Sequence, residues 1–414
     1  MKNPRLLLNE VLKDIEPDEK YQKEIFSRID EIIKKINKNK VGVTAVLGGS
    51  GAKGTWLKTF DADIFALFDY KKYSNKSPQI SDVLEKILKK SFKIIRLHGS
   101  RDYFQIKQNE FTFEIVPILR ITKAEQAKNI TDVSPLHSNW VSRHKKLVHE
   151  MKLAKQFAKS NNLYGAESHL RGFSGYVCEI LTVNYGSFQN LLKNAQIWKE
   201  KTVIDVQKFY KRQDVFKIVN TSKLTSPLIV IDPVQKDRNA AAALSIEKFN
   251  EFKDIAKKFL KDPSKEFFKR KVMKDTFPKS ASKRLLIVKS KLLDDKIDIA
   301  GSKIVKINEF LSQRLQKNGF RILRNEMEFK ERTAFIYYLF PSADLEKIRL
   351  IEGPPLKLQT HAANFKKIHR KTFVKKGKVC VIEARKFTNP GVLLRELVKD
   401  PYIRQRCKSI GIEN

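Results

Sequence analysis

Residues 48–65 read GGSGAKGTWLKTFDADIF, and this stretch is the strongest indication of the fold in the N-terminal part of the chain. A glycine-rich turn is followed by Asp61 and Asp63, and apolar runs lie on either side. Side chains two positions apart on a β-strand point to the same face, so both carboxylates would face whatever the turn binds. Glycine turns offer backbone N–H groups to phosphate oxygens, and carboxylates hold Mg²⁺ against such oxygens. The stretch therefore predicts a metal-dependent nucleotide site.

The flanking segments predict a small α/β unit around this stretch. Helical spacing of apolar residues indicates one or two amphipathic helices over 4–38 and another helix over 80–88. Short apolar runs indicate strands at 43–47, 63–68 and 111–118, the last closed by Pro117.

Glu114 lies in the third of these strands and is the candidate for a third carboxylate. An unpaired carboxylate in an apolar strand would be costly to bury, so a cation is its expected partner. The alternative is that Glu114 is an exposed residue of an edge strand. Two metal ions need more than two carboxylates to hold them, which favours the first interpretation.

The charge balance indicates a polyanionic partner. The 414 residues include 83 Lys and Arg against 46 Asp and Glu, a net charge of +37. Such a charge attracts nucleic acid. The alternative is an organism whose proteins are generally rich in lysine. The length predicts about two to four domains.

The three cysteines lie far apart in the sequence, which excludes a cysteine-based zinc site or a disulfide framework. No apolar run approaches the ~20 residues of a membrane span, and the N-terminus has no apolar signal-peptide core. We therefore expect a cytoplasmic protein without a membrane partner.

The rest of the chain predicts an α+β multidomain protein. Helical patterns dominate residues 144–260, interrupted by an extended run at 229–233, and Ser174 is a candidate helix N-cap. The remainder mixes a helix at 304–316 with strands at 333–339 and 378–382. The expected division is a catalytic head with a mixed sheet (1–142), a helical neck (143–262), and an α+β body and tail (263–414).

The order of motifs resembles the DNA-polymerase-β-like nucleotidyltransferase superfamily. Its pattern runs Gly-Ser, then Asp-x-Asp, then a third acidic residue. Here Asp61 follows Ser50 by 11 positions, and Glu114 stands on a later apolar strand.

Further blocks narrow the resemblance to archaeal class I CCA-adding enzymes, the tRNA nucleotidyltransferases, over essentially the full length. These blocks are GSGAKGTW (49–56), PLHSNW (135–140), NLYGAE (162–167), RGFSGYVCE (171–179), IDPV (231–234) with Arg238-Asn239, and EARKFT (383–388). The resemblance implies template-independent addition of CCA to tRNA from CTP and ATP, with Mg²⁺ as cofactor. A homodimer is likewise an expectation of the resemblance.

The resemblance also assigns site residues. The implied catalytic metal ligands are Asp61, Asp63 and Glu114. The implied nucleotide-binding residues are Gly49, Ser50, Lys53, His137, Lys155, Tyr164 and Arg238. Other roles stay open at this point: a helix cap for Ser50, a surface cation for Lys53, a structural role for His137, core packing for Tyr164 and a salt bridge for Arg238.

Two positions depart from the family pattern. The family usually has Arg where this chain has Lys53, and Asp where it has Glu114. Lysine keeps the charge but loses bidentate contact with phosphate. Glutamate reaches one methylene further than aspartate. Neither change removes a required charge, so we expect activity to survive.

Two stretches mix cations with aromatic residues as a tRNA-binding surface would, at 253–284 and 365–376. The alternative for each is a solvated charged face. Two rival functions stay open as well. One is another RNA 3′-end nucleotidyltransferase, such as a poly(A) or oligo(U) polymerase, and the other is a non-catalytic RNA-binding protein.

Overall fold

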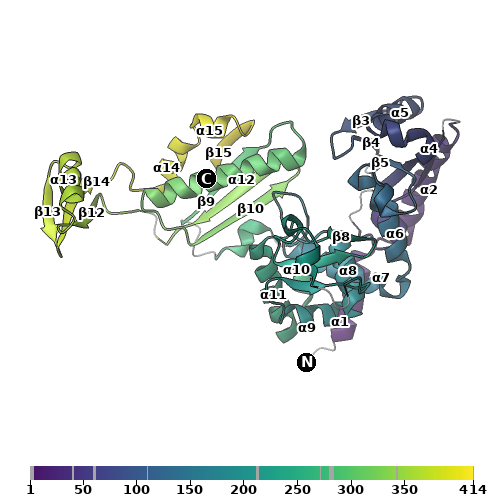
Figure 1. Ribbon diagram of the computed structural model, residues 1–414, viewed down its shortest axis with the longest axis horizontal. Coiled ribbons are helices and arrows are strands. Elements are labelled where there is room, and N and C mark those ends of the chain that lie inside the picture. The colour runs from purple at the N-terminus through teal and green to yellow at the C-terminus, as the bar shows by residue number, and fades with distance from the viewer. Residues whose placement is uncertain are drawn as a thin grey trace. The chain divides into compact units, whose positions relative to one another are not determined.

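The computed structural model describes residues 4–39, 42–58, 62–109, 111–210, 214–270, 272–278, 284–341 and 344–413. Contacts within the chain divide it into two units, residues 1–271 and 272–414 (Figure 1). Within the described ranges, no helix combines the length and the apolar character that a membrane crossing requires.

A five-stranded mixed sheet organises the first half of the N-terminal unit. Its order is β1-β2-β5-β4-β3. The strands are β1 (Val43–Leu47), β2 (Ala62–Phe68), β3 (Ile94–Leu97), β4 (Tyr103–Gln108) and β5 (Phe111–Leu119). β2 and β5 pair in parallel, and the other neighbours pair antiparallel. The predicted strands at 43–47, 63–68 and 111–118 are confirmed, whereas β3 and β4 were not predicted.

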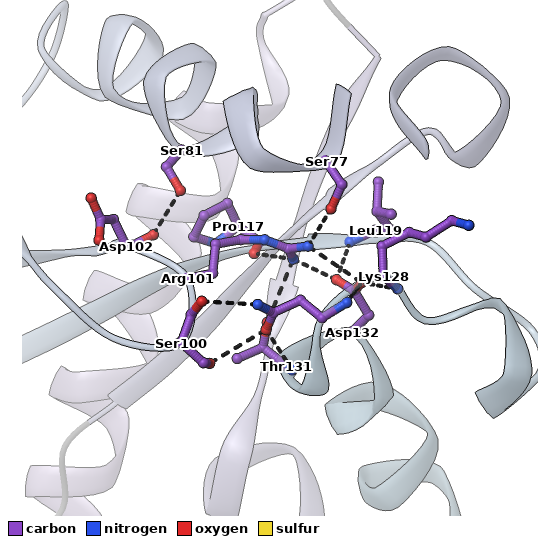
Figure 2. A network of polar contacts seen from close by, with 11 residues as sticks. Ser77, Ser81, Ser100, Arg101, Asp102, Pro117, Leu119, Lys128, Thr131 and Asp132 are labelled. Carbon is purple, nitrogen blue, oxygen red and sulfur yellow. Dashed lines mark hydrogen bonds and ion pairs between the residues drawn. The ribbon is translucent and has the colours of Figure 1, made fainter. Parts of the chain in front are cut away.

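The expectation that Pro117 closes its strand is wrong, because β5 continues to Leu119. Pairing of β5 with β4 ends at Ile115, and the Pro117 carbonyl accepts a hydrogen bond from the Arg101 side chain (Figure 2). The backbone nitrogen of Pro117 faces the same edge of β5 as its carbonyl. At this position that edge has no β4 residue opposite it, so no partner lacks an N–H donor. A proline in such a position breaks no ladder hydrogen bond.

Helices α2 (Glu19–Asn37) and α5 (Ile80–Leu88) pack on this sheet. Four isoleucines of α2 recur every three or four positions and are buried against the sheet, namely Ile25, Ile29, Ile32 and Ile36. This periodicity explains why the segment is helical. The short helices of this half are α3 (Gly49–Lys53), α4 (Tyr70–Tyr73) and α6 (Ser134–Ser142). The predicted helices over 4–38 and 80–88 are confirmed.

A second core fills the rest of the N-terminal unit. Its helices are α1 (Pro4–Ile15), α7 (Val148–Ser160), α8 (Gly175–Tyr185), α9 (Phe188–Ala195) and α11 (Ile246–Lys261), with the short α10 (Val215–Ile218) nearby in sequence. A small sheet joins β6 (Thr202–Ile204), β7 (Leu228–Asp232) and β8 (Gln235–Asn239). The Ser174 hydroxyl accepts from the Val177 N–H, which confirms the predicted N-cap of α8.

The aromatic residues of the basic stretch 253–284 pack into the protein's cores, and all but Phe267 are buried there. Phe259 and Phe268 are buried in the second core, and Phe267 packs against it. Phe277 is buried against Tyr337 in the C-terminal unit. The expectation of an aromatic RNA surface here is therefore wrong, since these rings stabilise the two cores instead.

The C-terminal unit contains two sheets. The larger has the order β10-β11-β9-β15 and the smaller β12-β14-β13. Their strands are β9 (Leu285–Lys291), β10 (Arg324–Lys330), β11 (Thr333–Leu339), β12 (Ile348–Pro355), β13 (Thr372–Lys375), β14 (Lys378–Ala384) and β15 (Ser409–Glu413). The helices are α12 (Ile297–Lys317), α13 (Gln359–Ile368), α14 (Pro390–Leu397) and α15 (Pro401–Arg404). The predicted helix at 304–316 and the strands at 333–339 and 378–382 are confirmed.

Candidate active site

Asp63 and Glu114 lie side by side in the head sheet. They are register partners in the parallel pair β2–β5, and register partners on neighbouring strands share a face. Gln105 of β4 donates from Nε2 to Glu114 Oε1 at 2.9 Å. Since β5 lies between β2 and β4, Glu114 is on a central strand, and the edge-strand alternative is excluded. Asp61 lies outside the described residues.

The glycine turn is held directly against Asp63. The Gly48 N–H donates to the Asp63 carbonyl at 2.8 Å. Gly49 has a φ of +52°, and a Cβ built on it would lie 1.7 Å from Asp63 Oδ2. Only glycine allows the backbone to approach the carboxylate this closely. Ser50 lies inside α3, whose N-cap is Gly48, so Ser50 does not cap this helix.

The donor set at this face fits a magnesium ion. Asp63 and Glu114 offer hard carboxylate oxygens on adjacent strands, and Gly49 has no side chain that would collide with the Asp63 carboxylate. Among the described residues, no group of three or more His, Cys, Asp or Glu side chains is arranged to hold a metal. The third implied ligand, Asp61, is outside those residues.

Both predicted triphosphate-binding lysines contact one buried carboxylate, Glu179 of α8. Lys53 Nζ lies 2.9 Å from Glu179 Oε2, and Lys155 Nζ lies 2.5 Å from Oε1. Thr55 adds a hydroxyl that donates to Glu179 Oε1 at 2.6 Å and accepts from Lys155 at 2.7 Å. Lys53 is therefore no ordinary surface cation, since its side chain is 11% exposed.

The charges of this cluster do not cancel. Burial alone would raise the pKa of Glu179, but Lys155 and Lys53 outweigh it and lower this pKa to about 2. Burial lowers the pKa of Lys155, partly offset by Glu179. One carboxylate faces two ammonium groups, so the cluster has a surplus positive charge when both lysines are protonated. Such a surplus favours an anionic ligand.

Tyr164 and Lys155 meet at Gly175, the first residue of α8. A Cβ on Gly175 would lie 2.6 Å from the Tyr164 hydroxyl and 3.3 Å from Lys155 Cε. Burial, with the nearby charges of Glu179 and Asp63 among lesser causes, raises the pKa of Tyr164, so its hydroxyl stays a neutral donor. Tyr164 packs against the second core, and Lys159 lies over its ring. Lys155 and Tyr164 therefore lie close together at the start of α8.

His137 and Arg238 converge on a second buried carboxylate, Asp232 at the end of β7. His137 Nε2 lies 3.0 Å from Asp232 Oδ2, and Arg238 Nη1 lies 2.5 Å from the same oxygen. Tyr176 stacks on His137 with 4.1 Å between ring centroids and donates to Asp232 Oδ1 at 3.2 Å. Lys53 Nζ lies 5.1 Å from the centroid of the Tyr176 ring, so the two clusters adjoin.

Asp232 is ionised in this environment. Burial would raise its pKa, but the hydrogen bond from His137 and the charges of His137 and Arg238 lower it. The salt-bridge alternative for Arg238 is therefore observed. It does not exclude a role in binding, because a guanidinium has five N–H donors and only one is committed to Asp232.

The sequence analysis did not name four residues of these clusters, which are Glu179, Asp232, Thr55 and Tyr176. A signal was present in the sequence for both carboxylates, since Glu179 stands in the apolar run VCEIL and Asp232 ends the run LIVID. A carboxylate in such a run must find a cation or several donors when it is buried. The sequence could not show which cations these are.

Three domain families match consecutive parts of the chain. The Second Messenger Oligonucleotide or Dinucleotide Synthetase domain matches residues 1–142. The second domain of tRNA nucleotidyltransferase matches residues 149–269. The C-terminal domain of CCA-adding enzyme matches residues 291–404.

Curated relatives match along nearly the whole chain. The CCA-adding enzyme of Nanoarchaeum equitans is 35% identical over 364 residues, 87% of this chain and 88% of that protein. The CCA-adding enzyme of Methanocaldococcus jannaschii is 33% identical over 95% of this chain and 90% of its own length. That of Archaeoglobus fulgidus is 29% identical over 99% of each.

Solved structures share the fold at low identity. A cytoplasmic RNA terminal U-transferase superposes with a TM-score of 0.52 and 14% identity, covering 66% of this chain and all of that chain. The Cid1 poly(U) polymerase superposes with a TM-score of 0.51 and 14% identity, covering 64% and 98%. The expected nucleotidyltransferase fold of the head within an α+β protein is confirmed.

Proposed function

The chain belongs to the family of CCA-adding enzymes, which confirms the resemblance found in its motifs, and from this premise we propose that it completes the 3′ end of tRNA with CCA. Its substrates are then CTP, ATP and a tRNA that lacks its terminal nucleotides. No nucleic-acid template is needed. The single observation that carries the catalytic part of the proposal is the pairing of Asp63 with Glu114 beside the glycine turn.

The proposed reaction is nucleotidyl transfer. The terminal 3′-hydroxyl oxygen of the RNA forms a bond with the α-phosphorus of the incoming nucleotide, and its proton goes to solvent. The bond from the α-phosphorus to the bridging oxygen breaks, and pyrophosphate leaves. Mg²⁺ held by Asp61, Asp63 and Glu114 would supply Lewis-acid stabilisation of the charge that develops on these oxygens. Gly49 lets the turn lie directly against the Asp63 carboxylate.

The triphosphate is bound by the surplus positive charge of the Glu179 cluster. Lys53 and Lys155 are proposed to donate to its oxygens, with Ser50 at the glycine turn and the neutral Tyr164 hydroxyl as further donors. His137 adds a donor from α6. The support is that Lys53, Lys155 and His137 gather within one unit around two adjoining buried carboxylates.

Arg238 is proposed to bind the edge of the incoming base. Its guanidinium keeps four N–H donors beyond the one that meets Asp232, and its side chain is 30% exposed. A planar fork of donors suits the acceptors of a base edge.

The basic surface is proposed to bind the acceptor arm of tRNA through its phosphates. The net charge of +37 supports this, and so does the run 365–376, in which Ile368 and Phe373 are exposed among lysines. The division into head, neck, and body with tail, and a homodimer, remain predictions. The tRNA substrate makes the cytoplasm the proposed location.

The test supplies purified protein and Mg²⁺ with tRNA lacking its last three nucleotides, and with CTP and ATP separately and together. Addition of two cytidines and then one adenosine, followed by arrest, supports the proposal. A long homopolymer would favour a poly(A) or oligo(U) polymerase instead. Binding of tRNA without any addition would favour the non-catalytic alternative.

A further inference from the structure

Asp232 is a buried carboxylate that ties together side chains from three separate elements. His137 comes from α6, Tyr176 from α8 and Arg238 from β8. Asp232 itself is completely buried, whereas the His137 side chain is 13% exposed and that of Arg238 is 30% exposed. The side chains of His137 and Arg238 are therefore accessible to a ligand, whereas the Asp232 carboxylate lies behind them.

Each oxygen of Asp232 has a distinct set of donors. Oδ1 accepts from the Tyr176 hydroxyl at 3.2 Å and from the Val234 N–H at 3.0 Å. Oδ2 meets His137 Nε2 at 3.0 Å and Arg238 Nη1 at 2.5 Å. The Val234 contact closes the turn between β7 and β8, so the backbone itself holds the carboxylate in place. The orientation of Arg238 is then set by a fixed anchor.

We propose that Asp232 is a positioning residue that sets nucleotide selectivity by fixing the guanidinium of Arg238. Asp232 Oδ2 contacts both Arg238 and His137, and it thereby couples the orientations of these two side chains. The inference rests on the proposed function, because it takes Arg238 as the group that meets the base. Asp232 does not touch the nucleotide. Its effect reaches the base only through Arg238.

The chemistry of the bases indicates what a fixed guanidinium would select. Cytosine and adenine each carry an unprotonated ring nitrogen next to an exocyclic amino group, whereas uracil and guanine carry a ring N–H at that place. Arginine has donors and no acceptor. A guanidinium held in one orientation can meet the ring acceptor of cytosine or adenine and oppose the ring N–H of uracil or guanine. A guanidinium free to rotate can avoid that clash.

Asp232→Asn tests the inference at nearly constant size. The amide removes the negative charge and turns one acceptor into a donor that faces Arg238 or its neighbours. We expect KM for CTP and ATP to rise about 10- to 100-fold, the range for losing a hydrogen bond to a charged group. We expect the preference for CTP over UTP in kcat/KM to fall at least about 10-fold, while kcat at saturating CTP changes much less. Asp232→Glu, which keeps the charge, should recover part of the preference.

The chain offers a matched control in Asp132. This carboxylate is also fully buried and also binds an arginine, with Arg101 Nη1 at 2.5 Å (Figure 2). It accepts from the backbone N–H groups of Leu119, Lys128 and Asn129, and none of these is a candidate for nucleotide binding. Asp132→Asn should lower Tm and leave the preference for CTP over UTP unchanged.

A double-mutant comparison shows whether Asp232 acts through Arg238. Asp232→Asn should reduce the preference for CTP over UTP far less in an Arg238→Met background than in the wild type. The inference is overturned if Asp232→Asn reduces the preference for CTP over UTP by the same factor in the Arg238→Met background as in the wild type. It is also overturned if Asp232→Asn changes this preference no more than Asp132→Asn does. A wild-type protein that adds no nucleotide to tRNA would instead overturn the proposed function. The two failures are therefore distinguishable in one set of assays.

Discussion

Gly49 faces the carboxylate of Asp63 so closely that a Cβ at Gly49 would lie 1.7 Å from Asp63 Oδ2. Gly49→Ala must therefore displace either the turn or the carboxylate. We expect kcat for CTP addition to fall at least about 100-fold, because small displacements of catalytic groups cost this much. Single-turnover addition of CTP to tRNA lacking its last three nucleotides measures the effect.

Gly54→Ala is the matched control, because Gly54 also has a positive φ, of +71°, but no atom of the described residues lies within 4 Å of a Cβ built there. Gly54→Ala should lower the free energy of unfolding by roughly 1 kcal/mol, because alanine is strained at a positive φ. Its kcat should stay nearly unchanged. Equal losses of kcat in the two variants would contradict the role of the close approach.

Asp63→Asn should abolish nucleotide addition and leave tRNA affinity within about threefold. The reason is that Asp63 lies beside Glu114 on a sheet face proposed to hold Mg²⁺, and metal chemistry supplies several kcal/mol of transition-state stabilisation. Glu114→Gln should act in the same way. Filter binding with labelled tRNA, run beside the addition assay, separates the two effects. A collapse of tRNA binding would make the residue structural.

Glu179→Gln should destabilise the protein by about 3–5 kcal/mol, the cost of removing one partner of a buried ion pair. The folded-state pKa of Glu179 is lowered to about 2 from 4.5. Its contribution to stability is therefore present above pH 4.5 and is lost as the pH falls toward 2. Urea unfolding between these pH values should show a steeper loss for the wild type than for the variant. Parallel curves would contradict this assignment.

Lys155→Met should raise KM for CTP about 10- to 100-fold, because it removes a proposed triphosphate contact that is charge-assisted. Lys152→Met is the control on the same helix, since Lys152 pairs with Glu16 at 2.8 Å and no contact joins it to a candidate residue that the structure describes. That variant should keep KM within about twofold of the wild type. Similar increases in both variants would point to a general effect on α7.

Combined replacement of Lys366 and Lys371 by Ala should weaken tRNA binding and reduce its salt dependence. Removing one lysine–phosphate ion pair lowers the slope of log affinity against log salt by about one. The matched control replaces Lys20 and Lys23 of α2, which removes the same charge from the head. If both double variants gave the same slope of log tRNA affinity against log salt, the net charge of the protein, and not the position of these lysines, would determine the binding.

Local patterns predicted most elements that fill a core. The isoleucines of α2 and the apolar run of β2 carry their own periodicity, so both were found. β3 was missed because it is a short edge strand without clear alternation, in which Ile95 is exposed. β4 was missed although Phe104 and Ile106 are buried and alternate with less buried polar residues. The phenylalanines of 253–284 were misread, because composition alone does not show which aromatic side chains are buried.

Residue types and their spacing were enough to identify the family and to predict a site chemistry. The glycine turn, Asp63 and Glu114 are recognisable from residue types, spacing and apolar context, and the motif blocks identify the family. Only the tertiary structure decided the partners of the cations. Glu179 lies 126 positions from Lys53, and Asp232 lies 95 positions from His137. These pairs form where α8 meets the glycine turn and where β7 meets α6, because burial forces each carboxylate to find its donors in three dimensions.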